Sequence, residues 1–556
     1  MENAKRVFNI LMMLTLLLIN FSGQNVSQTA DLIITGAKIW TGNKDQPWVK
    51  AMAIRSDAIL AIGSNEEILR LKRNNTKVLD LQNKFIVPGF IDSHVHFLTG
   101  GFNLSSVQLR DANSKEEFIR RISEYAKTVK PGTWILGGDW DHTLWGGTLP
   151  DRDWIDQVTL DHPVFVTRLD GHMSLANTLA MKLAGINDDI KDIAGGAIVR
   201  NLSGRLTGIF KENAAALIEN KIPPPSDEQT DKALIQAMNY VASKGVTSVH
   251  HMCGYLGAIE RARDNHSLIT RIYAMTPIEN WKELKERIDK NGKGDKWLKI
   301  GGVKGFVDGS LGSHTAAMLA PFTDSPADSG FFVNTEDDLY KWTLNADKEG
   351  LQVMIHAIGD RAIHYLLDMY DSVAIENGPR DRRFRIEHAQ HIAPDDIHRF
   401  SRSRIIASMQ PYHLIDDGRW AEKFIGLERM KTTYAFKSLF DSGATLAFGS
   451  DWFVAPPTPL EGIYSAVTRR TLDNKNPDGW VPEQKITVEQ ALMAYTKNGA
   501  FASFEEDIKG TLEPGKLADF VVIDADLTTI DPINIRDTKI LQTFVGGKKV
   551  YDSNGQ

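Results

Sequence analysis

The sequence is poor in cysteine, in basic runs and in long apolar stretches, and each absence excludes something. Cys253 is the one cysteine among 556 residues, so the chain cannot form an internal disulfide or a zinc site built from two or more thiolates. Lys and Arg number 64 against 71 Asp and Glu, with a formal net charge of -7 and no long basic run. We therefore expect no nucleic-acid partner. A metal, if the chain holds one, must be bound by histidine, carboxylate or a less common ligand.

What is present is typical of a large globular protein. The chain is 42% hydrophobic and 24% charged, which excludes a disordered, collagen-like or polytopic membrane protein. Its length alone allows three or four domains, although a single α/β barrel can take up about 250 residues or more.

A leader segment is indicated at the N-terminus. Lys5 and Arg6 precede an apolar run over residues 7–19, and polar residues follow it. This pattern predicts a signal peptide over about residues 1–23, and hence export to a periplasm, to the outside of the cell or into a secretory-pathway lumen. The run is shorter than the roughly twenty residues that span a bilayer. An uncleaved N-terminal anchor is the alternative, and it would be the one contact with a membrane.

The two ends of the chain have the pattern of short strands. Apolar residues alternate, with Gly or Asp at the turns, over residues 31–40 and 51–63 and again over 517–524 and 540–551. Because chain termini usually lie close together in a domain, we predict a small β-sandwich formed by residues 31–84 and 508–556.

The middle of the chain alternates between strands and helices. Eight apolar runs of strand length are separated mostly by segments of helical periodicity, which favours βα units and a parallel sheet. The runs are FIVPGFIDSHVH, GVTSVHH, ITRIYAM, GGVKGFVDG, LQVMIHAIGD, RFRIEHA, RIIASMQP and ATLAFGSD. We predict an α/β fold, a (β/α)8 TIM-like barrel over residues 85–507, with an insertion at about 100–226 beside its mouth.

The ends of these strands carry residue types that bind metals. His94 and His96 are two positions apart on one strand, so their side chains point to the same face. His356, His388 and Asp451 stand at the ends of later strands. Barrel enzymes place their sites at this rim, and four imidazoles with a carboxylate suit a divalent metal such as zinc.

Several segments together resemble the metal-dependent amidohydrolase superfamily. They are PGFIDSHVHF, the two later histidines, Asp451 and GTLEPGKLADFVVID. VKGFVDGSLGSHTA, HAIGDRAI, RIEHAQ and FGSDW resemble its amidohydrolase 3 branch, which includes N-substituted formamide deformylases. The resemblance extends from about Asp31 to the C-terminus. It implies a (β/α)8 barrel with a small β-sandwich from both chain ends, in agreement with the pattern of strands.

The resemblance also implies a set of ligands. His94, His96 and Asp451 would hold one metal, and His356 and His388 a second. Lys304, in the fourth run, would carry a CO2-derived carbamate between the two ions, because an unmodified lysine is a cation and repels metal. A one-metal variant would keep the same histidines, so both metal counts stay open.

The resemblance implies a hydrolase of the EC 3.5 class that cleaves a non-peptide C–N bond in a small-molecule amide, with an N-substituted formamide as one candidate. A metal-bound hydroxide would attack the carbonyl carbon, and Asp451 would carry the proton to the leaving nitrogen. Two alternatives stay open: an aminohydrolase (deaminase) acting on a heterocycle, and a non-catalytic barrel-fold binding protein. A homodimer is also open.

Three further histidines are candidates for substrate contact. They are His172 in the insertion, His251 at the end of the second strand and His314 after the fourth strand. Asp139, Asp141 and His142 in GGDWDHTLW have the polar and aromatic mixture of a lip that faces substrate, but we expect them on an exposed loop.

Other residues near the strand ends are expected to have structural roles. Asp308 and Gly309 would shape the loop after Lys304, and Asp360 could cap the helix after His356. Cys253 is expected to be a packed residue.

Overall fold

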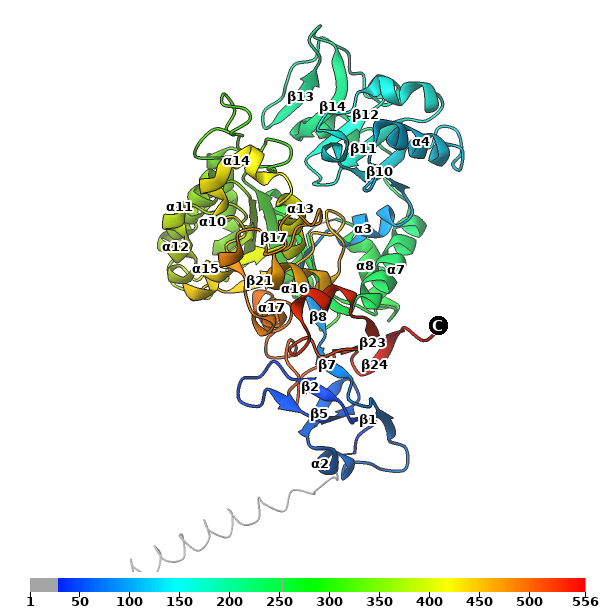
Figure 1. Cartoon of the computed structure of the whole chain (residues 1–556), viewed down its shortest axis with the longest axis vertical. Helices are drawn as coiled ribbons and strands as arrows, with labels where there is room; N and C mark the ends of the chain where they lie inside the picture. The colour runs from blue at the N-terminus through cyan, green and yellow to red at the C-terminus, as the bar shows by residue number, and fades with distance from the viewer. Residues whose placement is uncertain (1–28, 253, 556) are drawn as a thin grey trace, which may run out of the picture.

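The computed structural model describes residues 29–252 and 254–555. The predicted signal peptide and Cys253 lie outside these residues. Among the helices of the described residues, none combines the length and the apolar character that a membrane crossing requires. Figure 1 shows sheets built from the chain ends, a central barrel and an inserted unit at the opposite end of the molecule.

The centre is an eight-stranded parallel sheet whose strands follow chain order. The strands are β8 (Phe90–Val95), β15 (Val246–His251), β16 (Arg271–Pro277), β17 (Leu298–Phe306), β18 (Gln352–Ala357), β19 (Arg385–His388), β20 (Ile406–Met409) and β21 (Leu446–Phe448). The first and last strands are linked by two backbone hydrogen bonds, from Asp451 N–H to His94 O (2.7 Å) and from His96 N–H to Trp452 O (2.6 Å). The sheet is therefore a nearly closed barrel, and all eight predicted strands are confirmed.

Helices connect the strands of this sheet. They include α7 (Asp227–Ser243), α8 (Leu256–Asp264), α9 (Trp281–Asn291), α10 (Glu336–Lys348), α11 (Asp360–Asn377), α12 (Ile397–Arg402), α13 (Pro411–Asp417), α14 (Ala421–Met430), α15 (Phe436–Asp441), α16 (Pro459–Thr468), α17 (Val488–Ala494) and α18 (Lys497–Ala502). Helix α7 begins with a capping box between Ser226 and Gln229, and it buries Leu234 and Val241 in the main apolar cluster. Every residue of β8, β15 and β18 is buried. Burial on both faces is what a parallel sheet covered by helices requires.

Strands from both chain ends form two further sheets, in the orders β5-β4-β1-β6 and β24-β23-β22-β7-β2-β3. The bounds are β1 (Leu32–Thr35), β2 (Lys38–Trp40), β3 (Trp48–Val49), β4 (Ala51–Arg55), β5 (Ala58–Gly63), β6 (Lys77–Asp80), β7 (Phe85–Pro88), β22 (Phe520–Ile523), β23 (Ile540–Val545) and β24 (Lys548–Asp552). One apolar cluster takes side chains from both sheets, among them Ile34, Ile54, Phe520 and Phe544. Strand β7 pairs with β2 on one side and with β22 on the other, so N- and C-terminal strands share a sheet.

The first predicted run serves two sheets. It divides at Gly89 into β7, in the six-stranded terminal sheet, and β8, in the barrel. A Cβ at Gly89 would lie 2.2 Å from Thr247 Oγ1, so the backbone comes this close to β15 because it lacks a side chain. A buried bidentate ion pair also joins the barrel to this sheet: Arg271 donates to Asp519 at 2.6 and 2.9 Å.

The insertion has a sheet of its own, in the order β13-β14-β12-β11-β10-β9. Its strands are β9 (Val107–Gln108), β10 (Ile135–Trp140), β11 (Val164–Arg168), β12 (Met173–Ala176), β13 (Gly196–Arg200) and β14 (Leu206–Glu212), and α4 (Lys115–Ala126) and α5 (Thr178–Leu183) accompany them. Buried side chains gather in two apolar clusters, one around Phe118 and the other around Phe165. The predicted insertion is thus built around its own core.

Candidate metal centre and pocket

Three predicted ligands converge at the rim of the barrel. One ligand atom from each of His94, His388 and Asp451 lies within 4.8 Å of the others, and all three residues are buried. His94 is on β8, His388 ends β19, and Asp451 follows β21. The structure therefore groups His388 with His94 and Asp451, whereas the resemblance paired His388 with His356.

The other two predicted histidines lie beside this group. His96 Nε2 is 3.4 Å from Asp451 Oδ1, the same distance as His94 Nε2 from that oxygen. The ring centroids of His356 and His388 are 4.5 Å apart. His356 Nε2 lies 3.0 Å from the carbonyl oxygen of Gly309, to which it donates. All five strand-end residues named from the sequence thus lie at one place on the rim.

Hydrogen bonds fix the tautomers of two imidazoles. His94 Nδ1 lies 2.5 Å from Glu387 Oε2, and His388 Nδ1 lies 2.8 Å from Gln410 Oε1. Because both partners are acceptors, Nδ1 carries the proton in each ring and Nε2 keeps its lone pair. Within the described chain, His94 Nε2 and Asp451 Oδ1 are buried without a hydrogen-bond partner. Two buried acceptor atoms 3.4 Å apart are costly unless a cation satisfies both, so these residues fit a metal ion.

Burial also sets the protonation states that metal binding needs. It lowers the pKa of His94 below its usual 6.5 and the pKa values of His356 and His388 well below it, so the three imidazoles are neutral at pH 7. Burial alone would raise the pKa of Asp451, but His94 and His96 hold it well below 3.8. Neutral imidazoles and an ionised carboxylate are the forms that ligate a divalent ion.

Lys304 belongs to the same neighbourhood. It lies on β17 and is buried, with Nζ 3.7 Å from the centre of the Phe306 ring. After burial, the charge of Lys304 is among the causes that lower the pKa values of His94, His356 and His388. Lys304 thus lies buried close to three imidazoles, and a change in the charge of its side chain would act directly on them.

Two of the ligands have unusual backbone conformations. His388 has φ of 73° and Asp451 has φ of 58°, both in the left-handed region that costs non-glycine residues energy. Asp92 holds the second of these turns. Its carboxylate accepts hydrogen bonds from the N–H groups of Ser450 (2.9 Å) and His94 (3.3 Å), and so ties the start of the turn to β8.

A pocket lies beside the ligands, and both the barrel and the insertion line it. The barrel supplies His388 and Asp451, while the insertion supplies Arg168, Asp170 and His172. Asp170 Oδ2 accepts hydrogen bonds from Arg168 Nη1 at 2.6 Å and from Ser310 Oγ, in the loop after β17, at 2.5 Å. The insertion is thus part of the site.

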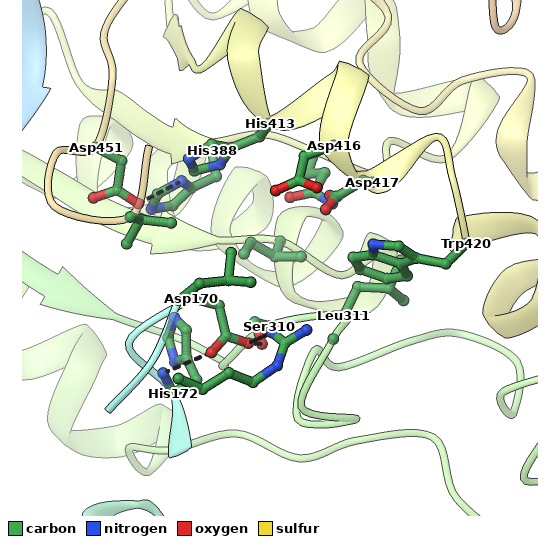
Figure 2. A pocket seen from close by; sticks show the side chains of 16 residues that line it. Asp170, His172, Ser310, Leu311, His388, His413, Asp416, Asp417, Trp420 and Asp451 are labelled. Atoms are coloured by element: carbon green, nitrogen blue, oxygen red, sulfur yellow. Dashed lines mark hydrogen bonds and ion pairs between the residues drawn. The ribbon is translucent and has the colours of Figure 1, made fainter. Parts of the chain in front are cut away.

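The opposite side of the pocket is acidic. Figure 2 shows Asp416 and Asp417 across the pocket from Asp170, with Trp420 at one end. Asp417 Oδ2 accepts hydrogen bonds from Tyr434 Oη at 2.6 Å and from Gln390 Nε2 at 2.7 Å. Burial nevertheless raises the pKa of Asp417 to about 7.

His172 lies where a substrate contact requires it. It lines the pocket, and its ring centroid is 5.1 Å from that of His356. Its Nδ1 is 2.9 Å from Glu212 Oε2, so the imidazole is held by the insertion while it faces the barrel rim. His172 therefore remains a candidate for binding substrate.

The other two predicted substrate contacts lie elsewhere. His251 Nδ1 accepts from Phe97 N–H at 3.1 Å, and its Nε2 donates to the carbonyl of Gly254 at 2.9 Å, so both ring nitrogens are used by the backbone. His314 packs against Phe322 and Phe424, its Nε2 bonds to Asp324 Oδ1 at 3.0 Å, and it is not among the residues that line the pocket. Neither histidine is among the residues that line this pocket, and contact of either one with the substrate stays a prediction.

Expectations for two loops also change. Asp141 and His142 are buried instead of exposed, and both contact Arg168. Asp360 is the first residue of α11, after Gly359 at the N-cap position, and its Oδ1 accepts a hydrogen bond from Arg361 N–H in the first turn at 2.9 Å. The N–H groups of Ile358 and Gly359, just before that helix, donate to Asp308 at 3.0 and 2.8 Å, so Asp308 organises both the loop and the helix start.

The prediction from sequence missed the residues behind the ligands. Glu387, fully buried, accepts from Arg385 Nε at 2.7 Å as well as from His94. Arg385 also contacts His250 Nδ1 at 2.9 Å inside the barrel. Strand alternation was the available signal, because Arg385 and Glu387 are two positions apart and share a face.

A nearly closed parallel barrel with histidines and an aspartate at its rim defines a class of proteins, the barrel-fold metal-dependent hydrolases. The chain belongs to the Amidohydrolase family, whose model matches residues 77–551. This assignment confirms the resemblance to the amidohydrolase 3 branch.

Similar proteins cover nearly the whole chain. It is 40% identical over 537 residues to the protein named LONG AFTER FAR-RED 3 of Arabidopsis thaliana, covering 94% of this chain and 92% of that protein. It is 25% identical to the N-substituted formamide deformylase of Arthrobacter pascens, covering 95% and 100%. Among solved structures, an uncharacterized metal-dependent hydrolase from Pyrococcus horikoshii OT3 matches with a TM-score of 0.73 and 28% identity, covering 90% of this chain and 99% of the other.

Proposed function

We propose that the chain hydrolyses a non-peptide C–N bond of a small amide, an activity of the EC 3.5 class. One observation carries the proposal: His94, His388 and Asp451 converge within 4.8 Å at the barrel rim, and a pocket lies beside them. The similarity to the N-substituted formamide deformylase of Arthrobacter pascens supports an N-substituted formamide as the substrate.

The residues at this site have distinct tasks. His94, His388 and Asp451 would hold a divalent ion, for which we propose zinc, and His96 and His356 would complete its surroundings. Such an ion supplies Lewis acidity, which activates water and polarises a carbonyl.

Asp451 and His172 would act on the substrate. Asp451 Oδ2 is the oxygen that would take a proton from the attacking water and return it to the leaving nitrogen. His172, whose Nδ1 is bonded to Glu212, has Nε2 left for the substrate.

The test combines metal analysis with substrates. The full chain is purified, its bound metals are measured by mass spectrometry, and it is assayed for formate, acetate, amine and ammonia release from N-substituted formamides, acetamides and amino-heterocycles. We expect a bound divalent metal and amide hydrolysis, and a loss of about 100-fold or more in kcat for Asp451→Asn. Metal-free, inert protein would support a non-catalytic binding protein, and preferential ammonia release from a heterocycle would support a deaminase.

We also propose that Lys304 carries a CO2-derived carbamate and that two metals bind. Burial of Lys304 among the histidines supports this, since a carbamate would replace a cation by an anion there. We expect Lys304→Ala to hold less metal per chain than the parent protein. An unchanged metal content and unchanged kcat in that variant would remove the bridging role.

Three further proposals concern the whole chain. The two terminal sheets share one apolar cluster, which supports a single β-sandwich made by both chain ends. The N-terminal sequence supports export, which N-terminal sequencing of the mature protein tests. We also propose that the chain forms a homodimer, which is tested by measuring its mass in solution by light scattering.

A further inference from the structure

A buried arginine of the insertion forms part of the pocket wall. Arg168 ends β11, is 1% exposed and lines the pocket. Its Nη1 donates to Asp170 at 2.6 Å, and its Nε donates to His142 Nδ1 at 3.3 Å. Burial, followed by the charge of Arg168, lowers the pKa of His142 to about 4, so that imidazole is neutral and can accept. Two of the three guanidinium nitrogens, Nη1 and Nε, therefore already have acceptors within the protein.

The third nitrogen, Nη2, differs from these two. Arg168 Nη2 is buried and, among the described residues, has no hydrogen-bond partner. Its ion-pair contact is Asp141 Oδ1 at 3.5 Å. Leaving a buried guanidinium N–H without an acceptor is unfavourable, so a pocket occupant that supplies an acceptor gains binding energy there.

We infer that Arg168 Nη2 binds the substrate by donating to a neutral hydrogen-bond acceptor, such as a second carbonyl or a hydroxyl. The inference rests on the proposed function and adds a feature of the substrate to it.

The charges around Arg168 decide in favour of a neutral acceptor. Asp170 and Asp141 already contact its single positive charge, and Asp416 and Asp417 line the same pocket. The other cations near the pocket are also paired, Arg419 with Asp141 and Asp416, and His172 with Glu212. A substrate carboxylate at Arg168 would therefore be a third anion beside this guanidinium in a partly buried site, where repulsion between like charges is strong.

A glycine leaves room for the guanidinium. A Cβ at Gly312, in the loop after β17, would lie 2.5 Å from Arg168 Nη1 and 2.8 Å from Nη2. Gly312→Ala would therefore displace the guanidinium without removing any charged group. This variant separates the position of Arg168 from its charge.

Three small amides test the inference. N-acetylglycinamide carries a second, neutral carbonyl, N-acetylglycinate carries a carboxylate in the same place, and N-propylacetamide has no second acceptor. Binding to the full chain, depleted of metal with a chelator so that no amide is hydrolysed, is followed by ligand-observed NMR, and kcat/KM is measured in the metal-loaded protein. We expect N-acetylglycinamide to bind roughly 10- to 150-fold more tightly than N-propylacetamide, as one hydrogen bond to a charged donor provides. N-acetylglycinate should bind more weakly than N-acetylglycinamide.

Variants of the protein test whether the preference for N-acetylglycinamide depends on Arg168. Arg168→Met and Gly312→Ala should both lose it, measured in each variant as the ratio of the affinity for N-acetylglycinamide to the affinity for N-propylacetamide. Arg205→Met is the matched control, since Arg205 pairs with Asp151 and Asp153 in the same insertion away from the pocket. Gly257→Ala is the control for the added methyl, because the nearest atom would be 3.6 Å away.

The outcomes separate the two proposals. Equal weakening of all three amides by Arg168→Met and Gly312→Ala, or tighter binding of N-acetylglycinate by the parent, overturns the role of Arg168. Discrimination that depends on Arg168 in protein that hydrolyses none of the amides would support this inference and refute the proposed function. Hydrolysis of the amides at rates that do not depend on Arg168 would support the proposed function and refute this inference.

Discussion

Replacing Glu387 by glutamine should weaken metal binding at a distance from the metal itself. Glu387 is fully buried and contacts both His94 Nδ1 (2.5 Å) and Arg385 Nε (2.7 Å). An amide in its place can offer either its oxygen or its NH2 group to His94, so the tautomer that leaves Nε2 free is no longer enforced. Loss of such a carboxylate–histidine contact typically weakens metal binding by about 10- to 100-fold.

The same substitution also removes the negative charge that faces Arg385. A buried ion pair that loses one partner typically costs about 3–5 kcal/mol. Three other contacts of Arg385, to Ser93 O (2.5 Å), Ser408 Oγ (2.9 Å) and His250 Nδ1 (2.9 Å), keep part of its hydrogen bonding. We therefore expect a loss near the lower end of that range.

The assay is a zinc titration against a chelator of known affinity, with urea unfolding of the metal-free protein alongside. Glu506→Gln is the control, because Glu506 pairs with Arg383 at 2.7 Å away from the ligands and its side chain is 31% exposed. That variant should bind zinc as the parent does. Parental zinc affinity in Glu387→Gln, with unfolding lowered to the expected extent, would refute the role of Glu387 in setting the tautomer of His94.

Two further predictions concern pH and domain contacts. Burial raises the pKa of Asp417 from 3.8 to about 7. Between these two pH values the folded protein keeps a proton on Asp417 that the unfolded chain has released. The contribution of this proton to the free energy of unfolding is complete below pH 4 and is lost as the pH rises through 7. Asp417 should contribute a fall in the free energy of unfolding of up to about 1.4 kcal/mol per pH unit over that interval. Burial also raises the pKa values of Asp92 and Asp308 to about 7, so Asp417→Asn should lower the slope in urea unfolding series by about 1.4 kcal/mol per pH unit and leave the rest. An unchanged slope would show that Asp417 does not contribute. Asp519→Asn leaves Arg271 charged and buried, so it should lower the free energy of unfolding by about 3–5 kcal/mol; a loss below about 1 kcal/mol would show that the pair does not hold the terminal sheet to the barrel.

Much of the barrel could be predicted because its strands have a recognisable sequence pattern. Apolar runs that end in Gly, Asp or His mark β18, β19 and β21, and residues at strand ends must meet at one rim. The candidate ligands could therefore be named without knowing any side-chain contact. Division of the first run at Gly89 was not visible, since its cause is the contact with Thr247, which is remote in the sequence.

Substrate contacts were harder to predict because they depend on orientation. His250 and His251 are adjacent, and only one can face the barrel interior. It is His250 that contacts Arg385, whereas His251 bonds to backbone groups near α3 (Phe97–Asn103). Arg168 lies in an insertion whose packing partners no periodicity reveals, and its role became visible with its contacts to Asp170 and His142.

The pairing of β7 with β22 has a consequence for synthesis of the chain. Pro88 is opposite Phe520 in this pair, so the partner of β7 leaves the ribosome about 430 residues later, which at about 5–20 residues per second is a wait of roughly 20 to 90 seconds. Until then one edge of β7 has no strand beside it and is open to pairing with other chains. A protein cut short before Phe520 would keep that edge permanently, and we expect it to aggregate even though every metal ligand is present.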